Sequence, residues 1–330
     1  FLQQHDVDWR TSLAVQRQVS ERAPKSSAMI PEEEVQALTL LTPIMRLELQ
    51  FVIQKDHVMK SPILKLWTVI DVRTVWGLCG HGTKVVALER GDELFDVDQP
   101  SEATFLVTKG SLLYTQESEN NPDIEELVPT GSWVAEAALW VEWLHVGACD
   151  AQNRSTEVFQ VVVDEFLKVM CTHPLIYKIT ADYGRQFHRC LTRAIPPLHS
   201  LPTDINHPGC DPVSLVLSMS RDSRVHLSQA VLEKATTGLG FVWGEVKDLK
   251  YDVASGHSVF MLTEAEEVVR VVSATTLRLH LDARTLLFEL GRCVGGHVQV
   301  TGKLPEMQQE MGEITEDTLE RMLSEDLHTF

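Results

Sequence analysis

The sequence predicts an α+β protein with a helical segment, then an antiparallel β-roll of jelly-roll type with flanking helices, and finally a smaller α/β unit. Three observations indicate this order. Apolar residues recur at helical spacing over residues 1–63, short apolar runs alternate with glycine-containing turns over 64–163, and prolines cluster over 195–212. A chain of 330 residues has room for about two or three domains.

Composition excludes several classes of protein. The chain carries 29 Lys and Arg against 47 Asp and Glu, a net charge of −18, which disfavours general binding to nucleic acid or to anionic membranes. The six cysteines form no Cys-x-x-Cys pair, so we expect neither a zinc ribbon nor a disulfide scaffold, and a reducing, intracellular setting. No apolar run is long enough to span a bilayer, so we expect no membrane insertion by this chain. Its start at Phe1 suggests a fragment, with an upstream membrane part left open.

Residues 1–63 are expected to be helical. Thr11–Glu21 has sparse apolar positions, and Pro31 followed by three glutamates is typical of a first helical turn. Pro43 restarts the pattern, and an apolar stripe follows. The stripe residues of this segment are Leu38, Leu41, Met45, Leu49 and Val52. Such short amphipathic helices need a partner surface, so we expect the segment to promote self-association.

The roll is predicted over residues 64–195. Its expected strands are Lys84–Leu88, Thr104–Val107, Leu112–Thr115, Leu127–Val128 and Val158–Val163. Asp164 is a plausible N-cap for a helix that ends at Met170, and Pro174 begins another that runs to Leu191.

Five prolines make 196–212 a predicted linker, and 213–330 a third unit. Its expected strands include Val213–Met219, Phe241–Val246, Ser258–Leu262 and His297–Thr301. Its expected helices are Ser228–Ala235, Glu264–Val272 and Thr315–Leu327.

Residues 64–193 resemble the cyclic-nucleotide-binding domain family. The order of three motifs carries the resemblance: the Gly-Asp turn of Arg90–Phe95, the strand and turn of Phe105–Gly110, and Gly131–Leu139, which is similar to the opening of the family's phosphate-binding cassette. The resemblance implies a β-roll closed by two helices, with cyclic AMP or cyclic GMP as the ligand and no other cofactor.

The cassette departs from the family pattern. In the family, a Glu reaches the ribose hydroxyl and an Arg pairs with the cyclic phosphate. Here Glu136 keeps the Glu position, but the preceding Gly is Ala135, and His145-Val146-Gly147 stand where Arg-(Ser/Thr)-Ala is expected. The candidate ligand residues are therefore Gly131, Ala135, Glu136, Ala137, His145 and Val146.

Two interpretations of the cassette are open, a residual ligand site and a roll that has lost its ligand. We favour the second, because a neutral His is a poor substitute for Arg. Trp140 and Trp143 also add bulk to the loop that holds the phosphate in the family. We expect weak or no nucleotide binding.

Residues 1–63 resemble the linker that precedes this domain in voltage-gated and cyclic-nucleotide-gated cation channels. Leu41–Leu49 and Pro62–Leu64 carry the likeness. It implies a regulatory region at the cytoplasmic face of a membrane, with a channel pore or other subunits of a homotetramer as partners. Without a channel, the chain is expected to be cytoplasmic.

Pro305–Thr329 resembles the Nudix hydrolase box, whose carboxylates hold Mg²⁺ on one helix face. The matching positions are Met322, Glu325 and Asp326, so the first ligand is lost. A thioether does not replace a hard oxygen ligand, so Glu325 and Asp326 are expected to be a relic that binds Mg²⁺ weakly or not at all. An apolar stripe of Leu319, Met322, Leu323 and Leu327 equally describes an ordinary helix packed on a sheet.

Two classes of function follow. The first is a non-catalytic regulatory region of an ion-channel-like protein, with no catalytic residues. The alternatives are a Mg²⁺-dependent nucleoside diphosphate hydrolase and a soluble cyclic-nucleotide sensor.

Overall fold

The structure is a computed structural model. It describes residues 8–22, 35–116, 124–196, 200–238, 253, 258–263, 267–280, 285–294, 297–308, 315–325 and 327.

Helices open the chain, as the sequence predicts. They are α1 (Trp9–Arg22), η2 (Gln36–Leu40), α2 (Pro43–Val58), α3 (Pro62–Ile70) and α4 (Val72–His81). Each of the last three begins at a polar N-cap, Thr42, Ser61 or Asp71, whose side chain accepts a hydrogen bond from the backbone three residues on. The sequence analysis missed α3 and α4. The expected start at Pro31 lies outside the described residues.

The predicted antiparallel roll is confirmed as two four-stranded sheets, in the orders β1-β8-β3-β6 and β2-β7-β4-β5. The strands are β1 (Thr83–Leu88), β2 (Glu93–Phe95), β3 (Ala103–Lys109), β4 (Ser111–Gln116), β5 (Ile124–Pro129), β6 (Trp133–Val134), β7 (Ala148–Ala151) and β8 (Thr156–Val162). Buried side chains from both sheets, among them Phe105, Leu112 and Val158, form one core between them.

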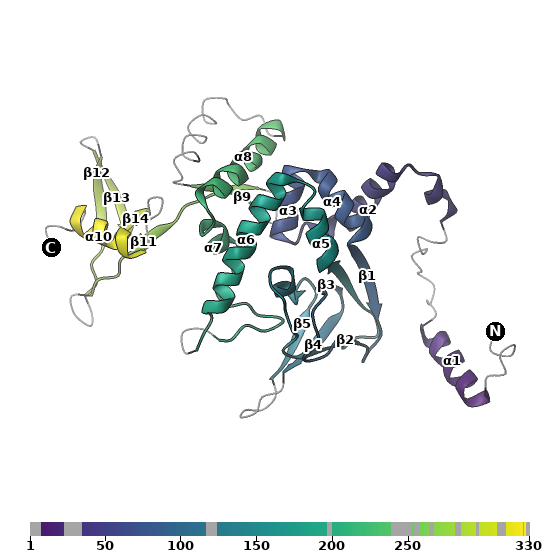
Figure 1. The fold of residues 1–330 in the computed structure, drawn as a ribbon. Helices are drawn as coiled ribbons and strands as arrows, with labels where there is room; N and C mark the ends of the chain where they lie inside the picture. The colour runs from purple at the N-terminus through teal and green to yellow at the C-terminus, as the bar shows by residue number, and fades with distance from the viewer. Residues whose placement is uncertain are drawn as a thin grey trace.

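Helices cover one end of the roll, as Figure 1 shows. They are η3 (Glu136–Leu139), α5 (Val163–Met170) and α6 (Pro174–Arg193), beside α3 and α4. Trp67 of α3 is fully buried, stacks on Phe166 of α5 at 4.8 Å between ring centroids, and donates from Nε1 to Thr180 Oγ1 of α6 at 2.8 Å. One side chain therefore joins three helices. The α5 helix begins at Val163, with Val162 and not Asp164 as its N-cap.

The third unit differs in part from the prediction. It contains α7 (Pro212–Leu217), α8 (Arg221–Gly238), α10 (Thr315–Glu325) and three two-stranded antiparallel sheets. The strands are β9 (Val259–Leu262), β10 (Val268–Val271), β11 (Ala274–Thr276), β12 (Glu289–Val294), β13 (His297–Lys303) and β14 (Glu306–Gln308), paired as β9 with β10, β11 with β14 and β12 with β13.

Two element predictions in this unit are wrong. The expected strand Val213–Met219 is α7, because Asp211 caps a helix with Pro212 at its first position. The expected helix Glu264–Val272 contains β10, whose β-branched valines pair with β9. The strand predicted at Phe241–Val246 lies outside the described residues.

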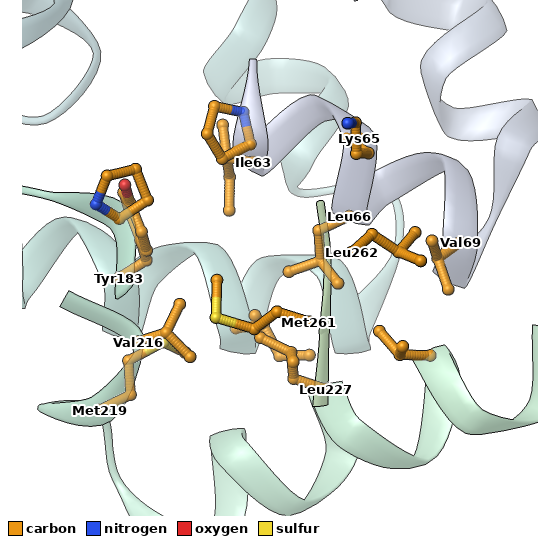
Figure 2. Close-up of a pocket in the computed structure, with 14 residues that line it drawn as sticks. Ile63, Lys65, Leu66, Val69, Tyr183, Val216, Met219, Leu227, Met261 and Leu262 are labelled. Atoms are coloured by element: carbon orange, nitrogen blue, oxygen red, sulfur yellow. The ribbon is translucent and has the colours of Figure 1, made fainter. Parts of the chain in front are cut away.

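A small apolar cavity of about 40 Å³ lies where α3, α6, α7, α8 and β9 meet. Figure 2 shows Leu66 of α3 and Met261 of β9 pointing toward this space. Beside it, the buried Lys65 donates from Nζ to the backbone oxygen of Thr263 at 2.7 Å. The elements α7, α8 and β9 of the third unit therefore pack against α3 and α6, and the Lys65–Thr263 hydrogen bond adds to this contact.

Within the described residues, no helix combines the length and the apolar character needed to cross a bilayer.

Candidate functional site

The predicted cassette folds as one tight turn followed by a short helix. Gly131, at a φ of 97°, turns the chain into β6, and Ala135 follows β6 in the left-handed region at a φ of 57°. Ala135 stands where the family pattern has Gly, and the backbone keeps the conformation that favours Gly. Glu136 and Ala137 then begin η3.

His145 and Val146 approach this turn from the segment before β7. The His145 side chain is buried and stacks on Phe95, with ring centroids 3.7 Å apart and an interplanar angle of 6°. Gly147 allows the segment to lie against Tyr114, since a Cβ at 147 would come within 2.6 Å of the Tyr114 ring. The structure thus brings the predicted cassette residues to one end of the roll.

A carboxylate from outside the roll contacts His145, Val146 and Gly147. Asp204 is fully buried, and its two oxygens accept five hydrogen bonds. Oδ1 lies 2.7 Å from His145 Nδ1 and accepts from Trp143 Nε1 at 2.8 Å. Oδ2 accepts from the backbone N–H groups of Val146 at 2.9 Å and Gly147 at 3.2 Å. It also accepts from the hydroxyl of Tyr114 at 2.9 Å.

The electrostatics of this contact favour the ionised carboxylate. Burial alone would raise the pKa of Asp204, but hydrogen bonds from His145, Trp143 and Val146 outweigh it and hold the pKa below its usual range. Because an ionised carboxylate only accepts, the facing Nδ1 of His145 must carry a proton. A backbone hydrogen bond adds to this contact, since the Ala135 N–H donates to the backbone carbonyl oxygen of Asp204 at 2.7 Å.

Asp204 comes from the segment predicted to be a linker. A turn presents it: Thr203 N–H donates to the Asn206 oxygen at 2.8 Å, and Thr203 Oγ1 accepts from Asn206 N–H at 3.1 Å. Ile205, the next residue, packs against the core of the roll. The predicted Pro-rich linker 196–212 therefore also supplies a buried residue to the roll. Sequence reasoning missed Asp204, and the Thr-Asp-Ile-Asn turn composition was the available signal.

The two tryptophans expected in the loop have different positions. Trp143 takes part in the contact through Nε1. Trp140 instead lies among Phe166, Tyr183 and Phe187, with ring centroids 5.1–5.9 Å away. The indole of Trp140 therefore adds its bulk beside α5 and α6, and that of Trp143 beside Asp204.

Among the described residues, Glu136 forms no hydrogen bond with Asp204, although it follows Ala135 directly. Burial raises the pKa of its carboxyl to about 7. Its charge in turn helps to raise the pKa of the Tyr183 hydroxyl, where burial is the larger cause. Glu136 is therefore a half-buried acid that faces α6 and differs from Asp204 in its protonation.

Only one residue of the predicted metal relic, Glu325, lies within the described residues. Glu325 is exposed at the end of α10, and Asp326 lies outside the described part of the chain. Met322 is fully buried, as the alternative interpretation of this helix expects. In the described residues, no group of three or more His, Cys, Asp or Glu side chains is placed to hold a metal ion.

Comparison with family models and with curated proteins identifies no family for this chain. No family model matches the chain, and no curated protein matches it either.

Three solved structures show partial likeness. A cyclic nucleotide-binding-like protein from Brucella abortus is 19% identical at a TM-score of 0.28, over 32% of this chain and 89% of its own. The N-terminal domain of a transcriptional regulator from Streptomyces coelicolor is 16% identical at a TM-score of 0.34, over 41% and 94%. The sensor domain of the transcriptional regulator DNR from Pseudomonas aeruginosa is 17% identical at a TM-score of 0.35, over 46% and 98%. Likenesses at this level establish neither the fold nor the function of this chain.

Proposed function

We propose that this chain is a non-catalytic regulatory region in which a roll of cyclic-nucleotide-binding type is self-liganded, meaning that Asp204 of the same chain occupies its cassette. One observation carries the proposal. Five hydrogen-bond donors converge on the Asp204 carboxylate at the position where the family resemblance puts the ligand phosphate.

Cyclic nucleotides are expected to bind weakly or not at all in this state. A nucleotide would first have to displace the buried Asp204 carboxylate from its donors. Removing one member of a buried, hydrogen-bonded charge contact costs about 3–5 kcal/mol, or roughly two to four orders of magnitude in affinity. The incoming phosphate would then meet His145 in place of a guanidinium fork.

Calorimetry with cyclic AMP and cyclic GMP on the full chain tests the proposal. The unmodified chain should give no saturable heat at nucleotide concentrations of about 1 mM. Asp204→Ala combined with His145→Arg and Val146→Thr should bind measurably, because the cassette is emptied and the counter-ion restored. Asp211→Ala is the control, since Asp211 lies in the same segment but only caps α7. A micromolar dissociation constant for the unmodified chain would favour the soluble-sensor alternative.

The channel context belongs to the same proposal. The linker resemblance of residues 1–63 supports a place beside a channel pore at the cytoplasmic face of a membrane, with other subunits as partners. The exposed apolar side chains of α2 support a role in subunit contact. Their exposed fractions include 65% for Ile44 and 62% for Val52. The association experiment at the end of the Discussion tests this part.

A further inference from the structure

A second hollow lies beside the cassette, between η3, α5 and α6. It encloses about 500 Å³, within the range of small-molecule sites. It shares η3 with the cassette but none of the residues that contact Asp204. The self-ligand contact therefore leaves this groove open, and we call it the α5–α6 groove.

The floor of the α5–α6 groove is apolar and aromatic. Phe166 and Met170 of α5 are buried beneath it, and Leu167 keeps 40% of its surface exposed at its edge. Trp140 lies edge-on to Phe166, with ring centroids 5.9 Å apart at 90°. Gly184 lets α6 approach this indole, since a Cβ there would lie 3.0 Å from Trp140 Cε3. The floor is thus a built surface suited to an aliphatic chain.

The rim of the groove is basic. Arg185, His188 and Arg189 line it from α6 at positions i, i+3 and i+4, which share one face of a helix. The basic rim is therefore a local exception to the net charge of −18 that the whole chain carries.

The internal partners of these arginines leave charge available. Arg185 is 67% exposed and lies 3.2 Å from Asp182 Oδ1. The other oxygen of Asp182 already accepts from the N–H and Oγ of Ser220. Arg189 donates to the neutral amide oxygen of Gln186 at 3.2 Å. Arg185 is thus already ion-paired with Asp182, and Arg189, which donates to a neutral amide, supplies the charge with which a further anionic group can pair.

An additional buried donor lies in the same wall. Trp140 Nε1 is buried and has no hydrogen-bond partner within the part of the chain that the structure describes. Buried donors are normally satisfied, so this indole N–H is an unpaired polar atom beside the groove, and the aliphatic floor described above does not depend on it.

We propose that the α5–α6 groove binds a monomeric long-chain fatty acid. The aliphatic chain lies on Trp140, Phe166 and Met170, and the carboxylate pairs with Arg185 and Arg189. A monomeric ligand fits better than a membrane surface. The net charge of −18 repels an extended anionic surface, whereas one carboxylate interacts mainly with the local rim.

Displacement of a fluorescent fatty acid by palmitate, on the full chain, tests the proposal. Palmitate should bind saturably with micromolar affinity, and hexadecanol, which lacks the charge, at least about tenfold more weakly. Arg185→Gln with Arg189→Gln should weaken palmitate by a similar factor, and Leu167→Asp should weaken the contact with the tail. Arg193→Gln is the matched control, because Arg193 is exposed on the same helix but does not line the groove.

Three outcomes would overturn the proposal. The first is equal affinity for palmitate and hexadecanol. The second is unchanged palmitate binding in the double arginine variant, with its fold verified by circular dichroism. The third is binding to phosphatidylserine vesicles without binding of monomeric palmitate. None of these outcomes bears on whether Asp204 occupies the cassette, so the two proposals fail separately.

Discussion

At Asp204, one carboxylate organises five donors that come from two separate parts of the chain, Tyr114 of β4 and the segment 143–147. Asp204→Asn keeps the shape but turns one acceptor oxygen into a donor that faces other donors. We expect it to lower the free energy of unfolding by about 3–5 kcal/mol, measured by urea denaturation. Asp211→Asn is the matched control and should cost about 1 kcal/mol, the value of an N-cap.

The pH dependence checks the same contact. The pKa of Asp204 is lowered in the folded chain, so its stabilising contribution is present above the ordinary carboxyl pKa and is lost as the pH falls below it through the lowered pKa of the folded chain. The difference between the Asp204→Asn variant and the unmodified chain should therefore shrink in acid. A difference that does not change with pH would contradict an ionised carboxylate at this position.

Glu136 should show the opposite pH dependence, because its ionisation lowers the stability of the folded chain as the pH rises. Burial raises its pKa from 4.5 to about 7, so the folded chain holds this proton more tightly than the unfolded chain does. The penalty for ionising it is absent below pH 4.5 and grows until about pH 7. Glu136→Gln should thus raise the free energy of unfolding by about 1–3 kcal/mol at pH 8 and change it little at pH 4. Glu142→Gln, at an exposed position, is the control.

The sequence predicted which residues belong to the site only where a local motif contains them. His145 and Val146 were found because they follow Gly131–Leu139 at a familiar spacing, and the structure places them in the same site. Asp204 is separated from His145 by 59 positions, and no local pattern indicates such a contact. Its role depends on the path of the chain after α6, which composition alone does not determine.

Among the elements, two helix starts with a proline were predicted correctly, whereas the similar starts of α3 and α7 were not. Pro43 and Pro174 each stand at the first turn of a helix, with a capping side chain before it. The apolar run at α7 was read as a strand because its length fits both kinds of element, and the cap at Asp211 decides it. Long-range packing, not local propensity, also fixes which face of α10 is buried.

The α10 helix provides an element-scale prediction. Met322 is fully buried, whereas its neighbour Leu323 is 45% exposed, so the expected stripe does not include Leu323. Met322→Glu would restore the third carboxylate of a Nudix-like box but place a charge in the core. We expect it to destabilise the unit of α10, β11 and β14 by at least about 3 kcal/mol. Hydrogen exchange of these elements measures the loss of stability.

Leu323→Glu is the matched control, since it makes a similar change one residue further at an exposed site. It should leave hydrogen exchange nearly unchanged. Phosphate release from a nucleoside diphosphate sugar with Mg²⁺ should be undetectable in both variants and in the unmodified chain. Release by the unmodified chain that disappears in Glu325→Gln would favour the hydrolase alternative.

At the scale of the whole molecule, the α2 helix has one face packed and one face uncovered. Gln54 and Val58 are buried. Ile44, Met45, Val52 and Ile53 are 50–65% exposed, at a spacing that places them on one side of the helix. Of the stripe expected from the sequence, Met45 and Val52 belong to this exposed face, and Leu49 is half-buried.

We expect this uncovered face to mediate self-association, because contiguous exposed apolar surface commonly marks an interface. The full chain should sediment as an oligomer at concentrations of about 10–100 µM, and Met45→Glu with Val52→Glu should shift it to monomer. Val85→Glu with Val97→Glu is the control, since these side chains are 50% and 45% exposed on the roll and outside the proposed interface. A monomeric unmodified chain, or an equal shift in both double variants, would contradict a specific role of α2. A loss confined to the α2 variant would place the subunit contact on the segment that resembles a channel linker, and so connect the self-liganded roll to an assembly.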